Sequence, residues 1–139
     1  MTRLIHSTAA VLVIVGIAVG TLVAQAKFVP PIKGEAEIQM ILAKPDVDHK
    51  ANTVTTKIKV KNISPTGSIA GLKVEQFWWD KANSPTPVSV GTFRLKKPLL
   101  PGEEGLMEIQ VPYDTKMFRD TYQFTHGNGK IKVKAVKAF

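Results

Sequence analysis

The sequence predicts an all-β domain, a seven-strand antiparallel β-sandwich, preceded by one N-terminal hydrophobic helix. Three observations predict it. Short stretches alternate apolar and polar residues, Gly, Pro, Asn and Asp separate these stretches, and the long apolar run is confined to the N-terminus. The chain has 139 residues and no cysteine, so one domain of ordinary size must be stabilised by its core without a disulfide.

The N-terminal segment reads as an export signal. Residues 4–26 contain no Asp, Glu, Lys or Arg, follow Arg3 and end in the small-residue triplet that closes on Ala26. As a helix this segment would be about 34 Å long, enough to span a bilayer. Two fates stay open: cleavage after Ala26, or retention as a single-pass inner-membrane anchor. We expect the anchor, with the N-terminus cytoplasmic and the rest periplasmic.

Two further features of the N-terminal region bear on assembly. Gly16 and Gly20 form a G-x-x-x-G pattern, which lets another transmembrane helix approach closely. Residues 27–34 contain Pro30 and Pro31 and predict an extended spacer between the membrane and the domain of residues 35–139.

The first two strands carry the clearest alternation. In residues 35–42, apolar side chains at even positions alternate with glutamates and Gln39, and Lys44 and Pro45 then break the pattern. Residues 53–62 place apolar side chains and Thr56 on one face and a row of lysines on the other.

The next two strands are residues 69–80 and 88–95, separated by a polar loop. The first ends in Phe77, Trp78 and Trp79, where alternation is lost, which indicates a bulge or burial of both faces. If Trp78 fills the core, Trp79 faces outward and becomes a candidate contact residue.

Three shorter patterns complete the sandwich. Residues 107–111 follow a proline-containing turn, a sixth strand is marked by Tyr122 and Phe124, and a glycine-rich turn leads to residues 131–135. The expected bulk of the core is aromatic: Phe77, Trp78, Phe93, Tyr122 and Phe124.

Residues 71–111 resemble bacterial FxLYD-type and related immunoglobulin-like envelope domains. The aromatic strand ends in Asp80, and the later run Leu99-Leu100-Pro101-Gly102-Glu103 precedes a strand, as in that family, although Trp79 replaces the family's Tyr. Tyr122 and Phe124 are similar in spacing to the tyrosine corner of immunoglobulin-like sandwiches. The resemblance implies an immunoglobulin-like, non-catalytic module behind a membrane anchor.

Chemistry-bearing residues are few. His6 lies at the membrane edge of the N-terminal segment, His126 lies in a turn, and Asp46, Asp48 and His49 gather donors that a solvated turn explains better than a metal site. No catalytic or phosphate-binding motif occurs. We therefore expect no enzyme, no cofactor and no small-molecule substrate.

The lysines are the strongest remaining signal of function, because the chain has 19 Lys and Arg residues against 11 Asp and Glu residues. They line two predicted strands, one with Lys57, Lys59 and Lys61 and the other with Lys130, Lys132 and Lys134. Such rows suit anionic lipid or an acidic protein surface, while the alternative is that they serve solubility and block edge pairing. Arginines are scarce and no aromatic residue interleaves with the rows, so nucleic acid is not expected.

These observations predict a non-catalytic accessory or structural subunit that stabilises a larger membrane protein complex. A photosynthetic reaction centre or a respiratory assembly is a possible setting. The alternative is a secreted β-sandwich that binds a small ligand, a polysaccharide or a metal after signal cleavage.

Overall fold

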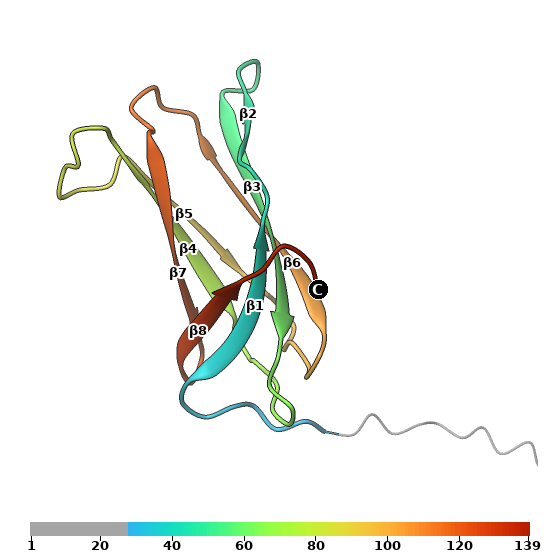
Figure 1. Ribbon diagram of the computed structural model, residues 1–139. Helices are drawn as coiled ribbons and strands as arrows, with labels where there is room; N and C mark the ends of the chain where they lie inside the picture. Colours follow the sequence, from blue (N-terminus) through green and yellow to red (C-terminus); the bar gives the residue numbers. More distant parts are fainter. Residues whose placement is uncertain (1–27) are drawn as a thin grey trace, which may run out of the picture.

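A computed structural model describes residues 28–139 as a curled β-sheet of eight strands (Figure 1). The strands are β1 (Ala36–Leu42), β2 (Asp46–Asp48), β3 (Thr53–Asn62), β4 (Lys73–Trp79), β5 (Ser89–Arg94), β6 (Glu104–Pro112), β7 (Arg119–His126) and β8 (Gly129–Ala135). The predicted N-terminal helix, with Gly16 and Gly20, lies outside the described residues. Within those residues, no helix has the length and apolar character needed to cross a membrane.

The sheet folds back on itself so that two halves face each other. Its hydrogen-bonded order is β2-β3-β1-β8-β7-β4-β5, and β6 pairs with β3. In one half, β3 lies between β6 and β1; in the other, β4 lies between β5 and β7. Strand β8 joins the halves, because it starts as a hairpin with β7 and then runs parallel to β1.

The all-β prediction is confirmed, but the seven-strand, wholly antiparallel arrangement is wrong in two respects. The structure has an eighth strand, β2, which pairs with the start of β3. All three β2 residues are exposed, so no apolar alternation marked them. The pairing of β1 with β8 is parallel, from Ala36 beside Ile131 to Met40 beside Ala135. Strands so distant in sequence carry no local sign of their relative direction.

The core lies between the two halves and is mainly aliphatic. Alternation holds through β4, where Trp78 is buried and Phe77 and Trp79 are half-buried on the outer face. Register with β7 continues to Trp79, so the predicted bulge is absent from this strand. Of the aromatic residues expected in the core, Phe124 is also buried, whereas Phe77, Phe93 and Tyr122 are half-buried. The bulk comes instead from Ile38, Ile58, Ile69, Leu72, Met107 and Ile109.

The segment before β1 is held against the domain. Ser68 forms backbone hydrogen bonds with Pro30 and Ile32, and its hydroxyl donates to the Val29 carbonyl. The backbone N–H of Gly34 donates to the Asn128 carbonyl at 3.1 Å. The two prolines thus lie in a stretch whose path is fixed by the folded body, which gives the spacer a defined exit direction at the lower end of Figure 1.

Candidate functional site

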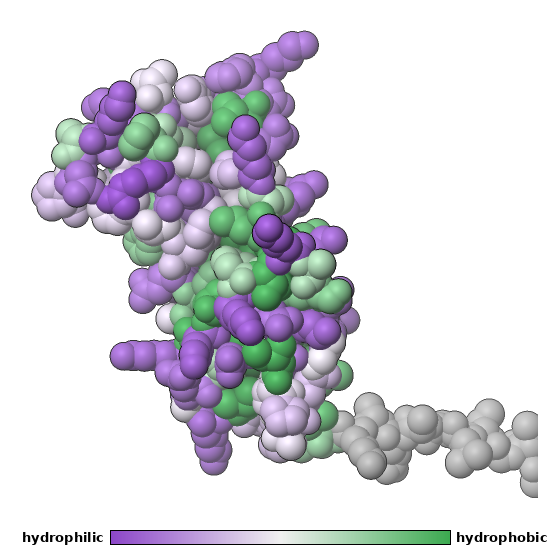
Figure 2. All heavy atoms as spheres, in the orientation of Figure 1, coloured by the Kyte–Doolittle hydropathy of each residue, from purple (hydrophilic) through white to green (hydrophobic). Residues whose placement is uncertain are grey.

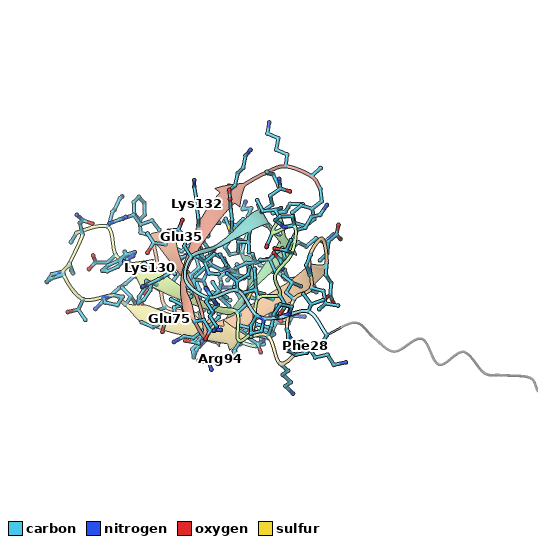
Figure 3. All side chains as sticks on the ribbon, turned by 90° about the horizontal axis from the view of Figure 1, so that it is seen from below. Phe28, Glu35, Glu75, Arg94, Lys130 and Lys132 are labelled. Carbon is cyan, nitrogen blue, oxygen red and sulfur yellow. The ribbon has the colours of Figure 1, made fainter. Side chains whose placement is uncertain are left out.

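The two lysine rows lie on one outer face of the curled sheet. Strand β1 lies between β3 and β8, with Gln39 beside Lys61 on one side and beside Lys134 on the other. Because alternate residues of a strand point to the same face, both rows project outward together. We call this surface the basic face: Lys57, Lys59, Lys61, Lys130, Lys132, Lys134 and Lys137. Figure 3, seen from below, shows Lys130 and Lys132 on the side of β8 and Arg94 on the opposite side.

Few carboxylates offset this charge. Glu108 and Glu104 lie opposite Lys57 and Lys61 on β6, and Glu37 lies beside Lys132. None of these pairs forms a salt bridge, since the one ion pair found among residues 28–139 joins Lys73 to Glu75 on β4. Most lysines of the basic face are exposed, so their ammonium groups are available to an acidic partner.

The basic face contains an apolar hollow of about 650 Å³. It is lined by the apolar side chains of Ile41, Leu106 and Phe139, by three lysines of the basic face and by Glu104. The C-terminal residues reach this hollow because the Val136 N–H continues the β1 ladder, donating to the Met40 carbonyl at 2.9 Å. Figure 2 shows apolar surface among hydrophilic side chains where β8 and β1 lie in Figure 1. The basic face therefore combines charge with an apolar anchor point.

Trp79 lies away from the basic face, on the outer surface of β4. Its ring stacks on Phe77 with 6.3 Å between centroids, and Arg119 lies 5.9 Å from its ring centroid. The indole N–H donates to the Thr121 hydroxyl at 2.9 Å. These contacts hold Trp79 against Phe77 on its own strand and against Arg119 and Thr121 on β7. The structure thus brings the lysine rows together and leaves Trp79 on the opposite half of the sheet.

The candidate metal-binding loop has local structural roles. The Asp48 carboxylate accepts hydrogen bonds from the backbone of Lys50 and Ala51, closing the turn between β2 and β3. His49 packs edge-on against Tyr113 at 5.2 Å. In the described part of the chain, no three His, Cys, Asp or Glu side chains gather as a ligand set.

His126 is buried at the end of β7, where it contacts the segment before β1. Its Nε2 atom lies 2.6 Å from the Gly34 carbonyl oxygen, and its Nδ1 atom accepts a hydrogen bond from the Asn128 N–H. A neutral ring protonated on Nε2 satisfies both contacts. His126, which the sequence predicts to be a turn residue, therefore connects the spacer to the domain.

A buried polar cluster, missed in the sequence, lies inside the sheet. The Gln76 amide nitrogen lies 2.9 Å from the Thr56 hydroxyl, 3.0 Å from Asp120 Oδ2 and 3.2 Å from the Tyr122 hydroxyl. Tyr122 donates in turn to Asp120, so the predicted tyrosine corner bonds to side chains. The sequence signal for this buried cluster was a polar residue, Gln76, at an inward position of an alternating strand.

The phenol of Tyr122 in this cluster is held in its protonated form. Burial, followed by the hydrogen bond to Asp120 and its negative charge, raises the pKa of the Tyr122 phenol well above its usual range. Tyr122 is therefore neutral at pH 7 and donates a hydrogen bond to the Asp120 carboxylate.

Comparison with known proteins shows no family for this chain. The sequence matches no protein-family model, and no curated relative matches it. Among solved structures, the chain is similar to IrmA from Escherichia coli, with 5% identity and a TM-score of 0.47 over 75% of this chain and 94% of that one.

Proposed function

We propose that this chain is a non-catalytic accessory subunit, held at the inner membrane by its N-terminal segment, whose basic face docks on an acidic surface of a larger membrane protein complex. The convergence of two distant lysine rows on one outer face carries this proposal. Rows serving only solubility would have no reason to share a face with an apolar hollow.

The geometry at the N-terminal end of the described chain supports the same proposal. Residues 29–34 are hydrogen-bonded along the domain, so the body has a defined orientation relative to the start of the described chain. Phe28, at that start, is 86% exposed, which suits contact with an apolar environment. Strands β1 and β8 rise along the body from this end (Figure 1), and the basic face that they form with β3 would meet the extramembrane part of a neighbouring subunit.

The proposal also covers the type of domain, the assembly it joins and the packing of its N-terminal segment. The resemblance of residues 71–111 to FxLYD-type, immunoglobulin-like envelope domains supports a periplasmic module behind an anchor. An energy-transducing assembly, photosynthetic or respiratory, is the setting we propose for it. Gly16 and Gly20 would pack on a helix of that assembly.

Charge reversal tests the docking surface. The triple variant Lys57→Glu, Lys59→Glu, Lys61→Glu should lose co-purification with partner proteins in mild detergent, measured by quantitative mass spectrometry. The matched control reverses three exposed lysines on loops elsewhere, Lys81, Lys96 and Lys97. Equal recovery by the two variants would contradict docking through the basic face, because both carry the same change in net charge.

The intact mass of the purified protein tests the anchor separately. We expect the mass of the full chain. Loss of residues 1–26 would instead establish the alternative, a secreted binding domain.

A further inference from the structure

Strands β7 and β8 separate soon after the hairpin that joins them. They pair at two positions only, Thr125 with Lys130 and His126 with Gly129. Strand β8 then leaves β7 and runs beside β1 as far as Ala135. Figure 1 shows this divergence, with β7 rising on one side and β8 crossing toward β1.

This separation leaves two strand edges without a neighbour. β7 is paired with β4 on one side, but on the other no strand of residues 28–139 pairs with it between Arg119 and Phe124. β8 is likewise paired only with β1 from Ile131 to Ala135, as far as the described chain goes. Edge N–H and C=O groups are ready to pair with another extended chain.

An apolar groove of about 730 Å³ lies between these edges. Its walls include Met40, Tyr122, Phe124, Ile131 and Val133. Phe124 is buried, while the other four are half-buried, so they retain apolar area that a ligand would cover.

The opposite opening of the curled sheet, between β5 and β6, is closed by tight packing. A Cβ atom at Gly91 would lie 2.4 Å from an Ile109 methyl and 2.7 Å from a Val111 methyl. The two openings of the curled sheet therefore differ. Gly91 allows β5 and β6 to pack closely, whereas β7 and β8 remain apart and are lined by apolar side chains.

Charge defines what fits the groove. The outward residues of β8 beside it are Lys130, Lys132 and Lys134, and those of β7 include Thr121 and Gln123. Neither strand presents an outward Asp or Glu along the groove. An inserted strand would place alternate side chains inward on apolar walls and the others outward beside lysines.

We propose that the groove between β7 and β8 receives an extended segment of a partner protein, added as a strand, in which apolar residues alternate with acidic ones. This goes beyond docking on the basic face, because the added strand is held by backbone hydrogen bonds and apolar contacts at a sheet edge. It shares only the lysines of β8 with that face.

Synthetic peptides test the proposal on the full chain in mild detergent. The probe is a fluorescent ten-residue peptide of alternating Val and Glu; controls are a block peptide of the same composition and an alternating peptide with a central Pro. Fluorescence anisotropy should show at least about tenfold tighter binding of the alternating peptide than of either control. Equal binding of the three would overturn the proposal.

Hydrogen exchange locates the added strand. Peptide binding should slow amide exchange in β7 and β8 and leave β3 unchanged. Protection of β3 instead would overturn the groove while supporting the basic face, so the two proposals fail separately.

A third test reverses the charge of two exposed lysines, so that no buried side chain is changed. Lys132→Glu with Lys134→Glu should weaken the Val and Glu peptide about tenfold and gain binding of an alternating Val and Lys peptide. The matched control, Lys57→Glu with Lys59→Glu, should keep the original preference. If both double variants lose binding equally, net charge explains it and the proposal is wrong. A second copy as occupant would appear as a dimer that excludes the peptide from the groove, which would also overturn the proposal.

Discussion

The Nε2 atom of His126 lies 2.6 Å from the carbonyl oxygen of Gly34, which joins the end of β7 to the segment that leads back to the N-terminus. Residues separated by most of the domain are connected by this contact. Together with the hydrogen bonds of Ser68 and Gly34, it holds the spacer against the body.

Replacing this imidazole should loosen the spacer. His126→Phe keeps an aromatic ring but removes the donor, and we expect a loss of about 1 kcal/mol in the free energy of unfolding. Thermal unfolding measures the loss, and hydrogen exchange should speed up at Gly34. His49→Phe, on an exposed turn, is the control; an equal loss there would contradict a specific role for His126.

Gly91 should not tolerate a side chain. In Gly91→Ala the new Cβ would meet methyl groups of Ile109 and Val111 at 2.4 and 2.7 Å. We expect destabilisation of about 1 to 3 kcal/mol, measured by denaturant unfolding. Gly105→Ala is the comparison, because its nearest contact would be 3.3 Å from Leu95. A smaller effect at Gly91 than at Gly105 would show that β5 and β6 are not packed as described.

The Tyr122 phenol should titrate above the ordinary tyrosine value of 10.0 because burial and Asp120 both raise its pKa. Because the pKa of Tyr122 is higher in the folded state, the protonated phenol stabilises the fold. This stabilisation is present in full below the pKa of the unfolded state and is lost as the pH rises through the pKa of the folded state. Ultraviolet absorbance during alkaline titration measures ionisation, and Tyr122→Phe assigns the step. In Asp120→Asn the step should move to lower pH; an unchanged step would contradict the contact between these side chains.

Asp80 should titrate below its ordinary value of 3.8, since hydrogen bonds from the backbone and hydroxyl of Ser84 favour its charged form. The resulting stabilisation is present above the unfolded pKa and is lost as pH falls through the folded pKa. Carboxyl NMR titration measures the midpoint. Ser84→Ala should raise it, and Ser64→Ala, in a different turn, should leave it where it was.

Strand β3 shows how much of the fold a local sequence pattern can predict. Its predicted span, residues 53–62, is the observed one, because a half-buried strand must alternate and the lysines identify its outer side. Strand β2 was missed because three exposed residues carry no such pattern. Trp78, named among the expected core aromatics, is buried, but the aromatic share of the core was overestimated, since Phe77 and Phe93 are only half-buried.

The sequence by itself determined the all-β class, most strand positions and the presence of two lysine rows, because these follow from residue periodicity and turn residues along a single strand. Only the tertiary structure decided that the rows share one face, that Trp79 lies elsewhere and that β8 leaves β7 to run parallel to β1. These features depend on which distant strands pair and in which direction. That choice is made by the burial of the whole apolar surface, and no local window of residues contains it.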